Sequence, residues 1–480
     1  MKKLSLQWLN NFGNERSRKT ALISKRKISF AELNEKIENK IFAFARLGIT
    51  KGSRVALIQK NGAAFIENVI ALWKLGATPT PINFRLPVEE IEQQIKFIDP
   101  LLTISAFSEI SKKLQSRGFT VRNKIRSGGY DKNDVSFHKN RLTDTALLMF
   151  TSGSASEPKC VELTFKNLIY SARNVNNLID ASNKTSWLAS LPFYHIGGFS
   201  IIIRALISGS TIILPNDLSA ASIAESVKKY SPDFLSLVPT TLKIILADKG
   251  NIFGKVKTIF LGGSAIGDEL VADVVKLKLP VIIVYGSTET SSMVTAAMFD
   301  DYKRFPRAAG KPIGENKILI LGKKGKQLSR GKIGDVVVSS AAAAKGYFNN
   351  RELTKLFFAS GGYLTNDVGY VNKEGLLFIK RRKDNVIISG GENIDLDALK
   401  KETLKLKSVS DVYLFGLPDK KWGTALTAAI VSEDEEKCKS EISKKFKGIK
   451  KPKKVYFVKE LPKSELGKVI KSELLKMLNL

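Results

Sequence analysis

Apolar residues follow helical and strand periodicities in alternation along the first 90 residues. In 28–49 (ISFAELNEKIENKIFAFARLGI) the apolar positions recur three and four residues apart, which predicts an amphipathic helix. The run 53–59 (SRVALIQ) predicts a short buried strand, and 62–77 predicts a second helix that leads into TPTPIN. Strands and helices that alternate in this way are typical of parallel sheets wound with helices.

Short apolar runs continue this pattern through the middle of the chain. Each ends at, or close to, a Gly, Pro or Ser that predicts the end of a strand: 145–150, 186–192, 209–215, 233–239, 256–263 and 280–286. In open parallel sheets, ligands bind outside the carboxyl ends of the strands. The residues that follow these runs are therefore the first candidates for a functional site.

Beyond residue 309 the pattern changes to short alternating strands separated by turn residues. The stretches NKILILGKKGKQLSRGKIGDVVVSS and GGYLTNDVGYVNKEGLLFIKRRKDNVIIS predict a small antiparallel β subdomain or barrel at 309–382. We expect a large α/β domain at 1–382 and a separate α+β domain at 383–480. In the second domain, strand-like VYLFG and LTAAIV alternate with helical patterns at 396–407, 436–447 and 468–478.

The length and composition agree with a folded chain of at least two domains. A single hydrophobic core seldom grows beyond about 250–300 residues, and this chain has 480. Hydrophobic residues make up 43% and charged residues 26%, as in an average soluble globular protein. The N-terminal residues lack the apolar core of a signal peptide, and no run of about 18 uncharged apolar residues occurs. We expect a cytoplasmic protein without stable membrane insertion.

The few cysteines and histidines exclude several classes of site. Cys160 and Cys438 are too few for a disulfide framework or a cysteine metal site, and they indicate a reducing compartment. His138 and His195 are the only histidines, which excludes a metal centre built from several histidines. With no G-x-S-x-G sequence either, there is little support for a Ser-His-Asp hydrolase.

The chain is strongly basic, with 77 Lys and Arg against 46 Asp and Glu and a formal charge of +31. Such a charge is typical of proteins that bind nucleic acid, anionic membranes or anionic small substrates. The excess is spread along the chain and is only mildly enriched in the last 80 residues, whereas a nucleic-acid surface requires clustering. No aromatic-basic RNA motif or zinc spacing occurs. We therefore favour a lysine-rich solvated surface and expect no nucleic-acid partner.

A hydroxyl-rich turn, TSGSASEPKC at 151–160, directly follows one predicted strand. Backbone N–H groups, hydroxyls and Lys159 of such a turn can surround phosphate oxygens. It is not a Walker A loop, because Lys159 lies between Pro158 and Cys160 rather than between Gly and Ser or Thr. Taken alone, it could also be an ordinary loop.

Two further polar segments follow predicted strands. In YGSTET, 285–290, the Thr288 hydroxyl and the Glu289 carboxylate suit a phosphate and its Mg²⁺. In YLTNDVGY, 363–370, Asp367 can accept hydrogen bonds from a ribose diol, and Arg381 follows fourteen residues later. The alternatives are a polar turn and a plain hairpin turn.

Two glycine-containing segments lie towards the C-terminus. The glycine pair in ISGGENI, 388–394, permits unusual torsions or close approach to a ligand. In LPKSELGKVIKSEL, 461–474, Lys468 follows Gly467 and can deliver positive charge to a developing oxyanion. In so lysine-rich a tail, a solvated charge is the alternative.

With these five motifs in this order, the chain resembles the acyl-adenylate-forming superfamily, which includes acyl- and aryl-CoA ligases, firefly-type luciferases and peptide-synthetase adenylation domains. The resemblance extends from about residue 8 to the C-terminus. It implies a large N-terminal domain of two wound sheets and a β-barrel, a hinge, and a small mobile C-terminal domain. It also implies activation of a carboxylic acid with ATP and Mg²⁺ to an acyl-AMP, and in many members transfer to coenzyme A.

The resemblance assigns roles to individual residues. Those of the ATP site are Thr151, Ser152, Gly153, Ser154, Lys159, Gly262, Gly263, Ser264, Tyr285, Gly286, Asp367 and Arg381. Thr288 reaches the α-phosphate, Glu289 binds the metal, and Lys468 bridges the acyl carboxylate and the α-phosphate. Lys383 is the hinge, and rotation there brings Gly390 and Gly391 to the coenzyme A thiol.

The run LPFYHIGGFSIIIRALISGSTIILP, 191–215, is most similar to that of o-succinylbenzoate:CoA ligases of menaquinone and phylloquinone synthesis. It places His195 at the edge of the acyl pocket, although a buried structural histidine is an alternative. Similar runs occur in fatty-acid and coumarate ligases, so a medium- or long-chain or another aryl acyl-CoA ligase remains an alternative. The partner is a small carboxylic acid in each case, and a homodimer is left open.

Several positions depart from the superfamily pattern. Ala155 lacks a hydroxyl, and Ser156 and Cys160 replace glycines of the phosphate loop. Asn366 stands where T-G-D has Gly, and Lys380 stands before Arg381 in place of Gly. If the loop needs left-handed torsions there, we expect a weakened phosphate site. A degenerate homologue that only binds nucleotide is therefore a further alternative.

Overall fold

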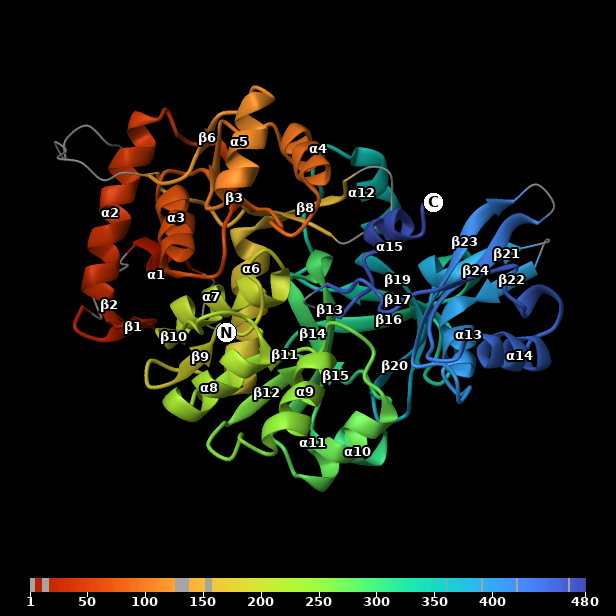
Figure 1. Ribbon diagram of the computed structural model, residues 1–480. Helices are drawn as coiled ribbons and strands as arrows, with labels where there is room; N and C mark the ends of the chain where they lie inside the picture. The colour runs from red at the N-terminus through yellow and green to blue at the C-terminus, as the bar shows by residue number, and fades with distance from the viewer. Residues whose placement is uncertain are drawn as a thin grey trace. The chain divides into compact units, whose positions relative to one another are not determined.

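The computed structural model describes residues 5–10, 17–125, 138–151, 158–359, 361–389, 392–419, 422–464 and 467–480 (Figure 1). The chain forms two compact units, the first made of Met1–Ile318 and Val338–Tyr363 and the second of Leu319–Val337 and Leu364–Leu480. Part of the predicted β-rich segment 309–382 therefore belongs with the C-terminal residues. Lys383 lies inside the second unit, and the division at 382/383 remains a prediction about the hinge.

The first unit contains a large mixed sheet, whose described strands lie in the order β15-β14-β13-β12-β11-β9-β10-β1-β2. The strands from β13 to β1 in this order run parallel, and β2, β14 and β15 pair antiparallel at the two edges. Their bounds are β1 Thr20–Ile23, β2 Lys27–Ser29, β9 Ser186–Leu188, β10 Thr211–Ile213, β11 Phe234–Leu237, β12 Thr258–Leu261, β13 Val281–Ser287, β14 Ser292–Ala297 and β15 Lys311–Pro312.

A second sheet of the first unit is parallel throughout, in the order β4-β3-β5-β6. Its strands are β3 Arg54–Ile58, β4 Thr78–Pro81, β5 Leu102–Ser105 and β6 Val121–Arg122. Together the two sheets confirm the α/β class predicted from alternating strand and helix patterns.

Helices with one apolar face connect these strands, and α2 and α3 lie side by side (Figure 1). The Ser29 hydroxyl accepts the Glu32 N–H at the start of α2, and Thr164 and Asn167 form a capping box at α6. The helices are α1 Gln7–Asn10, α2 Phe30–Arg46, α3 Ala63–Lys74, α4 Val88–Ile98, α5 Ser108–Ser116, α6 Phe165–Leu178, α7 Ile196–Ser208, α8 Ala220–Tyr230, α9 Pro239–Lys249, α10 Asp268–Lys276, α11 Phe299–Arg304 and α12 Arg351–Phe357. In the described ranges, no helix of either unit is long and apolar enough to cross a bilayer.

A small antiparallel sheet, β18-β8-β7, carries the stem of the predicted phosphate loop. Its strands are β7 Thr145–Phe150, β8 Cys160–Thr164 and β18 Gly346–Tyr347. Residues nearly two hundred positions apart are thus hydrogen-bonded neighbours, since Tyr347 pairs with Val161.

The second unit consists mainly of antiparallel strands with a few short helices. One sheet has the order β16-β17-β19-β20 and another the order β23-β24-β25, with β21 and β22 as a hairpin. The elements are β16 Lys317–Leu321, η3 Lys323–Gly325, β17 Gly334–Ser339, β19 Tyr363–Val371, β20 Leu377–Arg382, η4 Lys383–Asn385, β21 Val386–Ser389, β22 Glu392–Asp395, α13 Leu396–Thr403, β23 Asp411–Asp419, β24 Gly423–Val431, α14 Glu435–Lys445, η5 Gly448–Lys450, β25 Lys454–Phe457 and α15 Lys471–Met477. The described strand pairs form open sheets, so the predicted barrel remains a prediction.

Candidate functional site

Several of the predicted site residues of the first unit lie at one edge of the large sheet. Because β9, β12 and β13 run parallel, their carboxyl ends lie at the same edge. Gly263 and Ser264 follow β12, while Tyr285 lies at the end of β13 and Glu289 just beyond it. His195 follows β9 as the residue before α7. The structure therefore brings together at this edge residues that span almost a hundred positions of sequence.

Two glycines of this edge occupy positions that a side chain would disrupt. Gly263 has a φ of +87°, in the left-handed region that favours glycine. A Cβ atom on Gly286 would lie 1.9 Å from the Ser292 carbonyl oxygen, on the neighbouring strand β14. The close pairing of β13 and β14 therefore depends on glycine immediately before the residues that carry the predicted chemistry.

Glu289 lies in η2 (Thr288–Thr290), the short 3₁₀ turn after β13, with 9% of its surface exposed. Its Oε1 accepts a hydrogen bond of 2.9 Å from the Tyr347 hydroxyl, and its carbonyl oxygen accepts the Ala344 N–H at 2.8 Å. Burial, followed by the charge of the Glu289 carboxylate, raises the pKa of Tyr363 above its ordinary value.

The surroundings of Glu289 fit a magnesium ion that is held mostly by phosphate oxygens. Mg²⁺ in nucleotide sites takes one or two protein carboxylates together with substrate phosphates. Glu289 offers one such carboxylate, held in place by a tyrosine. The described part of the chain contains no group of three or more His, Cys, Asp and Glu that could hold a metal without a nucleotide.

Asn61, which lies outside the run 191–215, holds the segment before His195. The Asn61 side chain accepts the Phe193 N–H at 2.8 Å and donates to the Leu191 carbonyl oxygen, also at 2.8 Å. The His195 ring lies 4.7 Å from the ring of Tyr194, centroid to centroid. The turn that leads into α7 is therefore fixed by Asn61, at the end of the second sheet's central strand.

Arg204, a buried cation on α7, was not predicted from the sequence. The side chain is fully buried, its Nη2 lies 3.1 Å from the Ser292 hydroxyl, and its guanidinium lies over the rings of Trp187 and Phe260 at 5.5 and 5.9 Å. Its Nε and Nη1 have no hydrogen-bond partner among the described residues. Burial lowers the pKa of the guanidinium to about 9. The signal in the sequence is a single charge within the apolar run GGFSIIIRALI.

The predicted phosphate loop begins and ends on a hairpin. The Thr151 N–H donates to the Lys159 carbonyl oxygen at 3.0 Å, which extends the pairing of β7 and β8 beyond Phe150 and Cys160. Ser152, Gly153 and Ser154, with the divergent Ala155 and Ser156, lie outside the described residues.

The expectation that Cys160 strains the backbone of the phosphate loop is wrong. Cys160 opens strand β8, pairs with Phe150 and is not among the residues with positive φ. Its side chain is fully buried in the core of the first unit, where burial raises the pKa of the thiol. A strand residue with negative φ does not require glycine, so the side chain fills space rather than straining the loop.

In the second unit, Asp367 is buried on β19 and faces β20. Its strand partner is Arg382, whose Nε lies 3.5 Å from Oδ1 of Asp367, whereas the predicted Arg381 is exposed and pairs with Val368. Asn366 has a φ of +59°, a conformation that asparagine adopts more readily than most residues. This explains how asparagine can replace the glycine of T-G-D.

The predicted hinge and catalytic lysines also lie in the second unit. Lys383 begins η4, and its Nζ donates to the Asp335 carboxylate at 2.8 Å. Lys468 is exposed, its carbonyl oxygen accepts the Ser464 N–H at 2.7 Å, and Gly467 before it has a φ of +73°. Gly390 and Gly391 lie outside the described residues.

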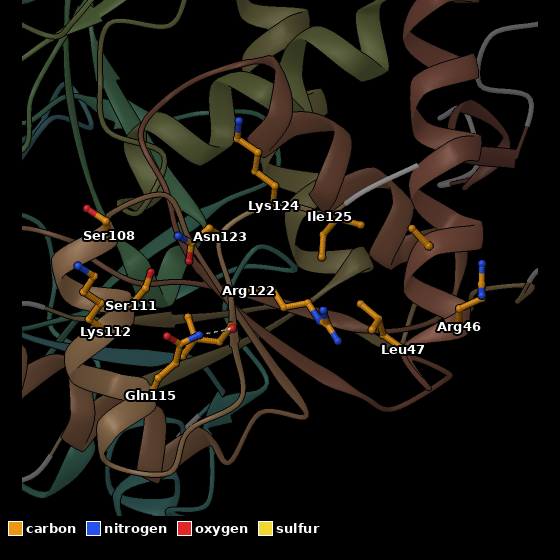
Figure 2. Close-up of a pocket in the computed structure, with 12 residues that line it drawn as sticks. Arg46, Leu47, Ser108, Ser111, Lys112, Gln115, Arg122, Asn123, Lys124 and Ile125 are labelled. Carbon is orange, nitrogen blue, oxygen red and sulfur yellow. Dashed lines mark hydrogen bonds between the residues drawn. The ribbon is translucent and has the colours of Figure 1, made fainter. Parts of the chain in front are cut away.

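A basic hollow of about 800 Å³ lies elsewhere in the first unit (Figure 2). It is lined at the end of α2, along α5 and at β6, and its basic side chains are Arg46, Lys112, Arg122 and Lys124. None of the predicted site residues lines it. The hollow is therefore separate from the carboxyl edge of the large sheet.

Two family models match this chain. The model of the AMP-binding enzyme family covers residues 9–348, and that of the AMP-binding enzyme C-terminal domain covers residues 403–468. Among similar curated proteins, the 2-succinylbenzoate–CoA ligase of Enterococcus faecalis is 27% identical over 449 residues, which covers 92% of each chain. The 2-succinylbenzoate–CoA ligase of Listeria monocytogenes is 29% identical over 473 residues, or 97% of this chain and 98% of its own.

Similar solved structures extend over nearly the full length as well. The o-succinylbenzoate CoA synthetase of Bacillus subtilis in complex with ATP and magnesium superposes with a TM-score of 0.86 at 25% identity, covering 97% of this chain and 98% of that one. The same enzyme in complex with its acyl-adenylate intermediate gives a TM-score of 0.85 at 26% identity, covering 97% of both chains.

Proposed function

The chain belongs to the AMP-binding enzyme family, and from that premise we propose that it is an ATP-dependent acid:CoA ligase acting on 2-succinylbenzoate. It activates the carboxylic acid to an acyl-AMP, releases pyrophosphate, and then transfers the acyl group to coenzyme A. The observation that carries the proposal is similarity to 2-succinylbenzoate–CoA ligases along 92% to 97% of this chain, at 27% to 29% identity. ATP, Mg²⁺ and coenzyme A are the cosubstrates and metal of this reaction.

In the first half-reaction, a carboxylate oxygen of the acid attacks the α-phosphorus of ATP, and the bond from that phosphorus to pyrophosphate breaks. Because two anions must approach each other, positive charge at the phosphorus lowers the barrier. Lys468 provides an ammonium group for this charge, and the Thr288 hydroxyl provides a hydrogen bond to the α-phosphate. Mg²⁺, when bound, neutralises phosphate charge, and the Glu289 carboxylate holds it.

In the second half-reaction, the sulfur of coenzyme A attacks the acyl carbon and AMP leaves with the electrons of the broken bond. The thiol gives up its proton to solvent as the thioester forms. Lys468 is not needed here, because no charge develops at phosphorus. We propose that the second unit acts as a mobile lid with its hinge at Lys383, which moves Lys468 away and brings Gly390 and Gly391 to the thiol.

The residues proposed to bind the nucleotide come from several segments of the chain. Thr151, Lys159 and the loop between them take the phosphates, while the edge at Gly263, Ser264, Tyr285 and Gly286 takes the adenine. Asp367 accepts hydrogen bonds from the ribose hydroxyls, and Arg382 lies beside it as an ion-pair partner that orients the carboxylate. Arg381 remains a candidate contact from the same strand.

The buried Arg204 favours a dicarboxylic substrate over a fatty acid. In 2-succinylbenzoate one carboxylate is activated, and the second remains as an anion that has to be accommodated in the protein. A buried cation whose Nε and Nη1 have no hydrogen-bond partner among the described residues can supply charge-assisted hydrogen bonds to such an anion. A monocarboxylic fatty acid has no group for it, and His195, at the start of the same helix, remains the proposed contact at the pocket edge.

Other features complete the proposal. We place the reaction in the cytoplasm, in keeping with two buried cysteines that form no disulfide among the described residues. A barrel within 309–382 and a homodimer remain part of the hypothesis, and neither a nucleic acid nor a membrane is required.

The test is acid-dependent consumption of ATP. With Mg²⁺ and 2-succinylbenzoate, we expect release of pyrophosphate and AMP, and with coenzyme A an aryl thioester identified by mass spectrometry. Formation of ADP and phosphate would rule out adenylation. Turnover of fatty acids alone in an acid panel would assign the chain to the fatty-acid ligases, and no turnover of any acid, with ATP still bound, would favour a degenerate homologue.

A further inference from the structure

Tyr347 connects two parts of the proposed active site that are far apart in the sequence. Its backbone, in β18, pairs with Val161 of β8, the strand that leaves the predicted phosphate loop. Its side chain contacts a different segment, because its hydroxyl donates to Oε1 of Glu289 at 2.9 Å. One residue therefore contacts both the stem of the phosphate loop and the proposed ligand of Mg²⁺.

The ring of Tyr347 is held firmly enough to fix the position of its hydroxyl. Only 7% of the residue is exposed, and the rings of Phe357 and Phe358 lie edge-on to it at 6.0 and 5.7 Å. The Tyr347 N–H also donates to the Thr354 hydroxyl at 2.9 Å. With its backbone hydrogen-bonded and its ring packed against two phenylalanines, Tyr347 has little freedom to move its hydroxyl away from Glu289.

The hydroxyl acts on the carboxylate group of Glu289 and not on the turn that carries it. The backbone of this turn is anchored separately: Ala344 N–H donates to the Glu289 carbonyl oxygen, and the Ser291 hydroxyl donates to the Ala342 carbonyl oxygen at 2.7 Å. Removing the phenol oxygen of Tyr347 would therefore leave the turn in place and release Oε1 of Glu289 from this hydrogen bond. Tyr363, the other tyrosine beside this carboxylate, would be retained.

We propose that Tyr347 is a positioning residue that orients the Glu289 carboxylate for the magnesium ion of bound ATP. This inference rests on the proposed function, since it takes Glu289 as the metal ligand. Groups that hydrogen-bond to a metal ligand fix its orientation, and their loss typically lowers metal affinity or activity about 10- to 100-fold. Because β18 also pairs with β8, Tyr347 links the turn that carries Glu289 to strand β8.

The test compares Tyr347→Phe with a matched control, Tyr302→Phe. Tyr302 is also fully buried in the first unit, and its hydroxyl donates to the Val281 carbonyl oxygen at 3.0 Å, away from Glu289. Calorimetric titration of each full-length protein with ATP, with and without Mg²⁺ and without acid, gives the factor by which Mg²⁺ strengthens ATP binding. We expect this factor to fall about ten-fold in Tyr347→Phe and to stay unchanged in Tyr302→Phe.

Two further measurements separate positioning from a general loss of structure. The Mg²⁺ concentration for half-maximal pyrophosphate release should rise in Tyr347→Phe, with kcat largely recovered at saturating Mg²⁺. In Glu289→Gln, the added Tyr347→Phe change should have no further effect on the Mg²⁺ factor, because the two groups act together.

An unchanged Mg²⁺ factor in Tyr347→Phe, or an equal loss in Tyr302→Phe, would overturn the inference. Failure of the proposed function would appear differently, as a wild-type protein that binds ATP but releases no pyrophosphate with any acid. The titrations without acid would still report on Tyr347 in that case.

Discussion

Glu289 and Arg204 are charged side chains that the first unit buries in different ways. Glu289 receives a hydrogen bond from Tyr347, so its charge is compensated by a neutral donor. Arg204 contacts one hydroxyl and lies against two aromatic rings. Its Nε and Nη1 have no hydrogen-bond partner among the described residues. A buried group without partners costs free energy, and such a cost is typically retained where function requires it.

Replacing Arg204 should therefore cost activity and not stability. A buried charge exchanged for an apolar side chain of similar size is often neutral or stabilising, so we expect Arg204→Met to keep or raise the melting temperature. Loss of a hydrogen bond to a charged group, about 1.5–3 kcal/mol, should raise the KM for 2-succinylbenzoate roughly 10- to 100-fold. Unsubstituted benzoate is the control acid, and an equal effect on both acids would contradict the assignment.

The stability difference between wild type and Arg204→Met should depend on pH. Burial lowers the pKa of the folded-state guanidinium to about 9, below its value in the unfolded chain. Below pH 9 both states carry the proton and the cost of burial is complete; above pH 9 the folded state binds fewer protons than the unfolded state, so this cost is relieved. Denaturant titrations should show the advantage of Arg204→Met shrinking between pH 8 and pH 10, and a constant difference would contradict this.

At the scale of elements, the hairpin of β7 and β8 shows why the unusual phosphate loop does not disable the fold. Cys160 is a strand residue that packs in the core with Leu148 and Phe348. The altered positions therefore differ in kind. Cys160 belongs to the packed stem, while Ala155 and Ser156, which lie outside the described residues, lack the hydroxyl and the glycine of the superfamily pattern.

Restoring the two loop positions should strengthen ATP binding. We expect Ala155→Thr with Ser156→Gly to lower the KM for ATP or raise kcat about ten-fold, equivalent to about 1.4 kcal/mol. Adding Cys160→Gly should bring no further gain and should lower the melting temperature, because it removes buried atoms and places glycine in a strand. A gain that appears only in the triple variant would show that Cys160 does restrict the loop.

The predicted hinge at Lys383 can be tested with a proline substitution that suits the backbone conformation of the preceding residue. Arg382, the residue before Lys383, is extended with φ −101° and ψ 140°, as a residue before proline prefers to be. Lys383→Pro should therefore fold normally yet resist rotation, sparing adenylation and impairing thioester formation. Asp335→Asn is the matched control, since it removes the Lys383 ion pair and leaves the backbone free. Equal losses in both variants would place the effect in the ion pair.

At the scale of the whole molecule, the residues proposed for the chemistry are distributed over two compact units. The carboxyl edge with Glu289 belongs to the first, and Asp367, Lys383 and Lys468 belong to the second. The net charge of +31 suits the proposed substrates, ATP, coenzyme A and a dicarboxylate, which are all anions. Under the proposed function, residues of the second unit contribute to one half-reaction and not to the other.

Lys468→Ala tests that division directly. Loss of one oxyanion donor costs about two orders of magnitude or more, so pyrophosphate release with saturating substrates should fall by about that factor. Thioester formation from supplied acyl-AMP should change much less, because Lys468 acts only on charge at phosphorus. The two half-reactions are measured separately by rapid quench, and equal losses in both would remove Lys468 from this role.

The amino-acid sequence by itself determined the local elements and the class of chemistry. The periodicities predicted α2, β3, α3, β7 and β13 to within a few residues, because apolar spacing reports directly on which face of an element is buried. The order of five short motifs indicated the family, since phosphate and carboxylate chemistry needs particular residue types at particular strand ends. Those inferences depend on residues that are close together in the chain, and their order can be read directly from the sequence.

Only the tertiary structure decided which distant residues meet. Asn61 holds the turn before His195, Tyr347 donates a hydrogen bond to Glu289, and Arg382 instead of Arg381 faces Asp367. The structure also decided that residues 319–337 group with the C-terminal residues and that Arg204 is buried. Each depends on strand register and on contacts between segments far apart in the chain. Register decides which of two neighbouring residues faces a partner, and a pattern of apolar spacing is the same for either choice.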